Sequence, residues 1–193
     1  MDIPSATPSY DFEIIQQTLR GRLPGLYRGV VEDNHDTLGN TARLQVSIPG
    51  LLDGATLKVW AKPCVPYAGP SVGFYSLPPK KAQVWIAFEA GLINHPVWIG
   101  CCWGKGDLPD TTGPTVKIWK TDKITIKIDD SADKIEISTT SGTKVTLATD
   151  AKIESGSATH TVGAAGVTSE AGSGKVEVTS AAVKINNGAF EVM

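Results

Sequence analysis

Residues 124–147 read ITIKIDDSADKIEISTTSGTKVTL. In this stretch isoleucine, valine or leucine alternates with polar residues in short runs, and the centres of three runs, at Ile126, Glu136 and Thr146, lie 10 residues apart. Alternation with a period of two is typical of a strand with one buried face, and the small polar residues between the runs are typical of turns. Related runs recur up to residue 185. The pattern therefore predicts a β-helix of stacked short strands.

The C-terminal part of the chain has few large apolar residues for its length. Residues 115–193 contain 20 of them and no proline, and each short run offers only one or two inward-facing side chains. We therefore predict that residues 116–193 form an intertwined triple-stranded β-helix, a homotrimeric needle whose three chains enclose one narrow apolar axis. The lack of proline fits this prediction, because proline has no N–H for a strand ladder. The residues expected inside the needle are Ile124, Ile126, Ile135, Ile137, Val145, Leu147, Val176, Val178, Val183 and Ile185.

The N-terminal half has a different composition. All 12 prolines lie between Pro4 and Pro114, and 11 aromatic residues lie in residues 1–103. Five short antiparallel strands usually close on themselves, which removes exposed edges, and the five-stranded partly open barrel is the OB-fold. We predict an all-β chain with such a barrel at 25–104 and a linker at 105–115. The five apolar, partly alternating runs expected to form its strands are 25–34, 42–50, 56–64, 83–91 and 95–103.

Residues 1–24 precede these runs and are predicted to be an N-terminal arm. The segment 10–19 has apolar residues at near-helical spacing, at Ile14, Ile15 and Leu19, so a short helix is expected there. Two roles for this arm stay open: it docks on a partner, or it packs on its own barrel.

Composition and motifs argue against several classes of protein. A net charge of -2 without a basic block argues against a nucleic-acid partner. No apolar run approaches the roughly 20 residues of a membrane span, and the first residues lack the pattern of a secretory signal. The three cysteines, two of them adjacent, indicate buried free thiols and not a disulfide framework. Because no Gly-x-Ser-x-Gly, P-loop or Cys-x-x-Cys motif is present, we expect no enzymatic activity and no catalytic residues.

Histidine is scarce, with His35, His95 and His160 only. A trimer would bring three copies of His160 together, and imidazole is a common metal ligand. An exposed or packed histidine is the commoner state, so we expect no cofactor and no metal. His160 is the one candidate for an axial ion.

The order of a small barrel and a slender needle resembles the central spike of contractile injection machines. This family includes phage baseplate assembly protein V and the VgrG proteins. Two loops depart from the family pattern: Lys80-Lys81 stands where a glycine-containing turn is usual, and LINHP (92–96) replaces an acidic, proline-containing turn. The segments that carry the resemblance are GLYRGVV (25–31), ARLQVSIPGL (42–51), VWAKPCVPYAG (59–69), GFYSLPPKKAQVWIAFEAG (73–91) and HPVWIGCCWG (95–104).

The resemblance implies a mechanical, non-enzymatic function. A homotrimer would sit in the baseplate of a virion or injection particle, after assembly in the bacterial cytoplasm. Its barrels would attach to a hub protein through residues that the sequence does not identify, and sheath contraction would push the needle through the target cell envelope. Phe190, Val192 and Met193 would form an apolar end that a separate PAAR-type tip protein covers.

Two other functions stay open on sequence alone. The first is an OB-fold protein with a β-rich tail that binds nucleic acid or carbohydrate, and the second is a trimeric receptor-binding fibre. An oligonucleotide site would require aromatic and basic residues together on a solvent-facing strand. Aromatic residues such as Trp85, Phe88 and Trp98 instead lie in apolar runs, and basic residues such as Arg28 and Arg43 are scattered over different strands. The sequence does not separate a phage tail from a bacteriocin, an extracellular injection particle or a secretion system.

Overall fold

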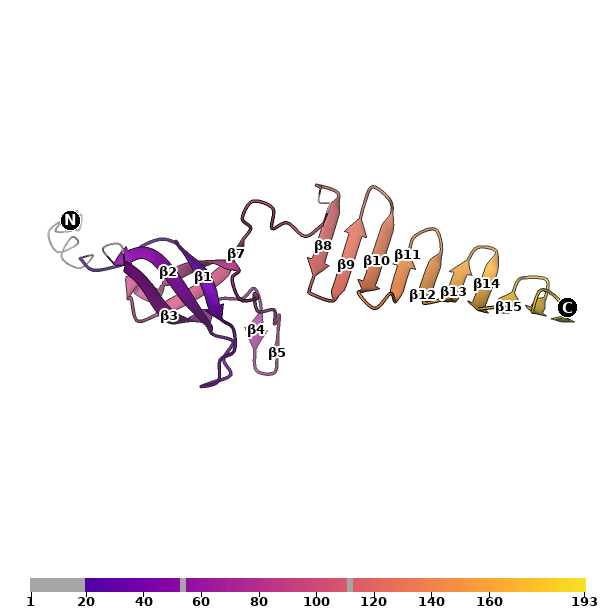
Figure 1. The fold of residues 1–193 in the computed structure, drawn as a ribbon, viewed down its shortest axis with the longest axis horizontal. Helices are drawn as coiled ribbons and strands as arrows, with labels where there is room; N and C mark the ends of the chain where they lie inside the picture. The colour runs from indigo at the N-terminus through magenta and orange to yellow at the C-terminus, as the bar shows by residue number, and fades with distance from the viewer. Residues whose placement is uncertain (1–19, 53–54, 111–112) are drawn as a thin grey trace, which may run out of the picture. The chain divides into compact units, whose positions relative to one another are not determined.

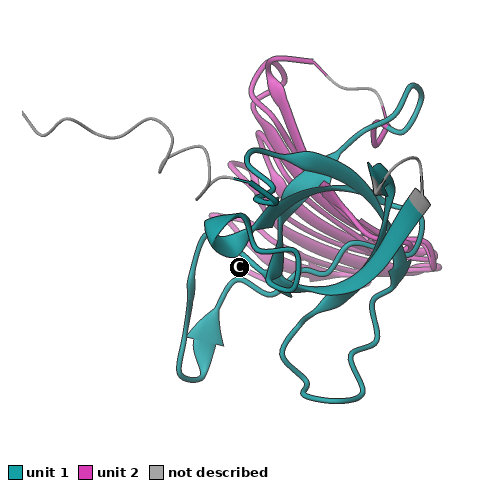
Figure 2. Ribbon diagram, turned by 90° about the vertical axis from the view of Figure 1, so that its left-hand side faces the viewer, with its two compact units in different colours: residues 1–107 teal, residues 108–193 magenta. Residues whose placement is uncertain are grey.

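A computed structural model describes residues 20–52, 55–110 and 113–193 as strands, turns and one short 3-10 helix, η1 (Glu89–Gly91). The chain divides into two compact units, residues 1–107 and 108–193 (Figure 2). The helix expected at 10–19 lies outside the described residues. The prediction of an all-β chain is confirmed. Over the described part of the chain, no helix has the length and apolar character needed to cross a membrane.

The N-terminal unit is a closed barrel with the strand order β1-β2-β3-β7-β6 (Figures 1 and 2). Four of its neighbouring pairs are antiparallel, and the parallel pairing of β3 with β7 closes the ring. The five-stranded barrel confirms the predicted OB-fold. Its strands are β1 (Tyr27–Asp33), β2 (Leu44–Leu52), β3 (Ala55–Pro63), β6 (Gln83–Phe88) and β7 (Pro96–Cys102).

The barrel core follows from the alternation of its strands. In β2, Leu44, Val46 and Ile48 are at most 1% exposed, and in β6 Val84 and Ile86 are fully buried. Every second side chain therefore points inward, as the period of two requires. The buried core consists of Val31, Leu44, Val46, Ile48, Ala61, Val84, Ile86, Phe88 and Trp98.

A single carboxylate, that of Asp36, holds the loop between β1 and β2. It accepts hydrogen bonds from Nε and Nη2 of Arg43 at 2.9 and 2.7 Å, from the backbone N–H groups of Leu38 and Thr41, and from the Thr41 hydroxyl. These bonds, above all the two from Arg43, hold the pKa of Asp36 well below its usual range. The Arg43 guanidinium also lies over the Trp60 ring, 5.7 Å from its centroid. The loop is thus anchored to the barrel, while Leu38 in it is 84% exposed.

The C-terminal unit is one antiparallel sheet of ten strands within residues 113–193, and each strand pairs with the next one along the chain (Figure 1). The strands are three to six residues long, and the last two, β16 and β17, have three residues each. A continuous ladder of short strands is compatible with the predicted β-helix. The strands are β8 (Val116–Lys120), β9 (Ile124–Asp129), β10 (Lys134–Thr139), β11 (Lys144–Leu147), β12 (Ala151–Ser155), β13 (Ala158–Gly163), β14 (Gly166–Ala171), β15 (Gly174–Val178), β16 (Val183–Ile185) and β17 (Phe190–Val192).

The cysteines are free thiols, as expected, but the prediction that they are buried is wrong. Cys64 and Cys101 are exposed, and Cys102 is half-buried. Cys64 directly follows β3, and Cys101 and Cys102 are the last two residues of β7. Side chains at strand ends lie near the rim of a barrel, where fewer neighbours cover them.

Leu44 and Leu38 provide a matched test of the barrel core. We expect Leu44→Ala to lower the free energy of unfolding of the barrel by about 2–5 kcal/mol, because the change leaves a cavity in a packed core. Leu38→Ala removes the same atoms from an exposed side chain, so its effect should stay within about 0.5 kcal/mol. Urea unfolding followed by tryptophan fluorescence measures both, since four of the five tryptophans lie in the barrel unit. Equal losses in the two variants would contradict the assignment of the core.

The ionised form of Asp36 stabilises the folded barrel, so its contribution depends on pH. A carboxylate whose pKa is lower in the folded state stabilises fully above its unfolded pKa, about 4, and less as the pH falls below that value. We therefore expect wild type to exceed Asp36→Asn in unfolding free energy at neutral pH, and the difference to shrink at about pH 3. Urea unfolding of both proteins at the two pH values tests this. A difference that does not change with pH would show that the charge of Asp36 contributes nothing.

Candidate functional site

The strand register of the C-terminal sheet gathers most of its large apolar side chains on one face, while Val116 and Ile118 lie on the other. Residues that oppose each other in antiparallel strands share a face, and here Ile137 lies between Ile126 of β9 and Val145 of β11. The same relation continues from Val145 to Ile153 of β12. This surface, termed the apolar face, consists of Trp119, Ile124, Ile126, Ile128, Ile135, Ile137, Val145, Leu147, Ile153, Val162, Val167, Val176, Val178, Val183, Ile185, Phe190 and Val192.

All ten residues expected inside the needle lie on this face. Other residues that the sequence did not assign to the needle interior lie there too, among them Ile153, Val162 and Val167. These three lie in or next to a stretch rich in alanine, glycine, serine and threonine, where single large residues give no recognisable run. Their place in the strand register, which the sequence does not provide, is what assigns them to the apolar face.

The apolar face is open to solvent in the single chain. Ile153 is 50% exposed, Leu147 47%, Val162 45% and Ile185 38%, although all of them lie inside strands. Soluble proteins rarely leave a contiguous apolar patch of this extent uncovered, and larger patches mark contact with another molecule. The face is therefore the main candidate for an interaction surface.

The opposite face of the sheet carries lysines and glutamates that pair across and along the strands. Lys144 Nζ lies 3.4 Å from Glu154, and Lys152 donates a hydrogen bond of 2.7 Å to the same carboxylate. The hydrogen bond from Lys152 is the main cause of the lowered pKa of Glu154. Exposed pairs of this kind contribute little stability each. They mark this face as the one that remains in water. The remaining pairs are Lys134–Glu136, Lys144–Glu136, Lys175–Glu170 and Lys184–Glu191.

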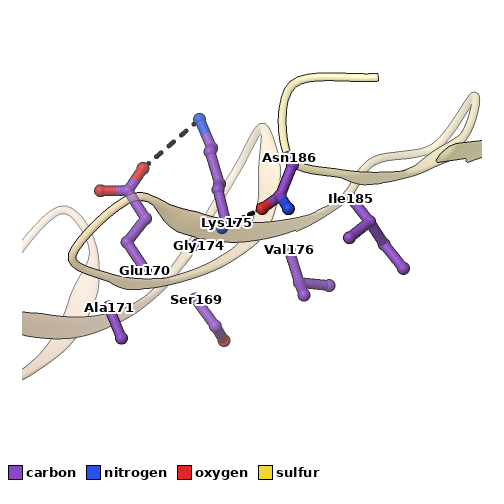
Figure 3. Close-up of a pocket in the computed structure, with 8 residues that line it drawn as sticks. All are labelled: Ser169, Glu170, Ala171, Gly174, Lys175, Val176, Ile185 and Asn186. Carbon is purple, nitrogen blue, oxygen red and sulfur yellow. Dashed lines mark hydrogen bonds and ion pairs between the residues drawn. The ribbon is translucent and has the colours of Figure 1, made fainter. Parts of the chain in front are cut away.

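Figure 3 shows the two faces near the end of the sheet. Glu170 and Lys175 project from one side of the ribbon, where their charged groups lie 3.4 Å apart. Ser169, Val176 and Ile185 project from the other side, together with Ala171, and line a shallow hollow. The hollow forms here because side chains such as those of Ser169 and Ala171 are small.

His160 interrupts the apolar face. It lies opposite Ile153 on one side and Ser169 on the other, and its Nδ1 is 2.7 Å from the Ser169 hydroxyl oxygen. Within the described residues, no cluster of three or more His, Cys, Asp or Glu side chains could hold a metal ion. An ion at His160 would therefore need ligands from further copies of the chain, and the expectation that no metal is bound stays a prediction.

The residues expected to contact a tip protein lie on and after the last strand. Phe190 and Val192 of β17 are 61% and 53% exposed, and Met193 is 99% exposed. Phe190 lies opposite Ile185, and Val192 lies opposite Val183. Two of the three residues therefore belong to the apolar face as well as to the end of the sheet.

Two pairs of basic and aromatic residues lie on the barrel surface. Arg28 of β1 lies over Trp85 of β6, 5.3 Å from the ring centroid, and Arg43 covers Trp60 in the same way. Trp98 is buried, as expected of a core aromatic residue, whereas Trp85 is only half-buried. The sequence placed these arginines on different strands, and the barrel brings each one to a tryptophan. One face of each ring is thus covered by a guanidinium group of the same chain.

A short ribbon of β4 (Ala68–Gly69) and β5 (Val72–Gly73) extends from the barrel (Figure 1). Beside it, Tyr67, Phe74 and Tyr75 are 60%, 49% and 72% exposed. The backbone N–H of Phe74 donates a hydrogen bond of 2.9 Å to the carbonyl of Tyr67, which extends the ribbon. The sequence alone does not single out this exposed aromatic group.

Comparison with known proteins finds one family model that matches the barrel. Residues 27–103 match the family model described as the type VI secretion system/phage-baseplate injector OB domain. The matched range runs from the first residue of β1 to just beyond the end of β7 and so spans the whole barrel. No curated protein matches the chain.

Proposed function

Because the barrel matches the family model of the type VI secretion system/phage-baseplate injector OB domain, we propose that this chain is the central, membrane-piercing spike of a contractile tail or injection machine. The spike is non-enzymatic and acts mechanically. It joins the tube and hub of the baseplate to the tip, and sheath contraction drives it through the target cell envelope. The observation that carries this proposal is the open apolar face of the C-terminal sheet.

In the proposed spike, three copies of the sheet cover one another's apolar faces. Isoleucine and valine side chains then meet along a common axis, while the paired lysines and glutamates face water. Strands of three to six residues are short enough to form the three sides of a slim prism. The burial of apolar area is the main favourable contribution to such an association. The homotrimer therefore accounts for both faces of the sheet at once.

The dimensions of the sheet fit a piercing function. Ten strands at a spacing of about 4.8 Å give a rod of roughly 45 Å. A bilayer with its headgroups is about 40–45 Å thick. A rod of this length with a hydrogen-bonded ladder along its axis reaches across such a layer without dissolving in it, because its outer face carries charges.

The two ends of the spike carry different proposed contacts. Phe190, Val192 and Met193 give an exposed apolar end for a PAAR-type tip protein. On the barrel unit, Tyr67 and Tyr75 beside the β4–β5 ribbon are the exposed aromatic residues that we propose as part of the hub contact. The spike acts as part of the baseplate of a virion or injection particle that is assembled in the bacterial cytoplasm.

The mass of the native protein tests the homotrimer. We expect three times the chain mass of 20.4 kDa by native mass spectrometry and analytical ultracentrifugation at micromolar concentration. Ile137→Lys should destabilise the trimer by more than about 3 kcal/mol per chain, because it would place an unpaired charge in an apolar interior.

Thr159→Lys is the matched control for this variant. Thr159 lies on the charged face between Glu154 and Glu170, so a lysine there keeps its charge in water beside two carboxylates. This variant should remain trimeric. A wild-type chain that is monomeric, whether or not it binds an oligonucleotide, would contradict the proposed spike.

A further inference from the structure

We propose that the pair formed by His160 and Ser169 sets the axial register of the three chains in the needle. This inference rests on the homotrimer proposed above and adds to it a specificity-determining site that is complete only when the copies meet. Within strands β9 to β17, His160 is the one ionisable side chain on the apolar face. The cross-strand row at this level reads Ile153, His160, Ser169, Val176.

The hydrogen bond within this pair involves only one of the two ring nitrogens of the imidazole. Nδ1 of His160 and the hydroxyl oxygen of Ser169 are 2.7 Å apart. Among the described residues, no hydrogen bond reaches Nε2 of His160. A buried imidazole requires partners for both ring nitrogens. When other copies cover the face, the partner of Nε2 must therefore come from those copies or from a water molecule held between them.

The surroundings of the pair in its own chain offer no such partner. Along the same face of β13 lie Ala158 and Val162, and opposite His160 on β12 lies Ile153. In a symmetric trimer in register, three His160 side chains meet at one level and share a polar centre. A copy displaced along the axis would set its Nε2 against isoleucine or valine of its neighbours, which leaves a polar group buried without a partner.

In this part of the sheet, few other contacts could fix the axial register of the three chains. The row beside the pair reads Ser155, Ala158, Ala171, Gly174, so large side chains that interlock are few. Strands poor in such side chains specify register weakly, and contacts between valine and isoleucine are nearly interchangeable between levels. A single polar layer in an apolar seam supplies the missing specificity, as a buried asparagine does in coiled coils.

The register is measured as a distance between copies of the full chain. A nitroxide label at Ser173→Cys, in the exposed turn between β14 and β15, is attached in a background with Cys64→Ser, Cys101→Ser and Cys102→Ser. With the polar pair intact, electron-spin distance measurement should give one narrow distribution. In the double variant His160→Val/Ser169→Val the chains should still associate, but a second, longer distance should appear. A shift by one hairpin corresponds to about 9.6 Å.

Thr161→Val/Thr168→Val is the matched control. These two residues oppose each other on the charged face, directly next to the polar pair in sequence, and the change from polar to apolar is similar. This variant should keep the single narrow distance. His160→Asn should also keep it, because an amide still supplies hydrogen bonds at that level.

Each outcome separates the register proposal from the proposed trimer. A trimeric double variant with one unchanged distance would overturn the register role and leave the trimer intact. A double variant that melts at lower temperature and keeps one distance would do the same, because it would assign the pair to stability alone. A monomeric wild-type chain would overturn the trimer itself and the register proposal with it.

Discussion

The C-terminal sheet depends on one constraint: most of its large apolar side chains lie on a face that the described residues of the same chain leave largely open. Within residues 113–193 each strand pairs with the next one along the chain, so the ten strands form a single sheet. The charged pairs on the opposite face keep that side in water. The proposed assembly covers the apolar face with the same face of other copies of the chain.

The barrel buries its large apolar side chains within one chain. Its parallel pairing of β3 with β7 closes the ring, so that Leu44, Ile48 and Ile86 pack inside a core of their own. On the barrel surface, the Asp36 carboxylate and the tryptophans that lie under arginines have their partners within the same unit. Among the described residues, the chain thus joins a unit with its own core to a unit whose large apolar side chains stay largely exposed.

The sequence predicted the strands well and the contacts between them poorly. Alternation with a period of two is a local property, so the five barrel strands and the ten expected needle residues could be found without a structure. The pairing of Arg28 with Trp85, the clamp of Arg43 on Asp36 and the hydrogen bond between His160 and Ser169 depend on register, which is set by turns and packing. The exposure of Cys64 and Cys101 was mispredicted because composition does not tell where a strand leaves the core.

The pairing of every needle strand with its sequence neighbour also bears on how the needle folds. Contacts between sequence neighbours close only short loops, and chains dominated by such contacts fold faster than those with distant pairings. In the proposed homotrimer the slow event is then the meeting of three chains, which depends on their concentration and not on a search within one chain. Synthesis of many copies in one place would therefore speed needle formation, while dilute chains would expose their apolar faces for longer and be prone to aggregation.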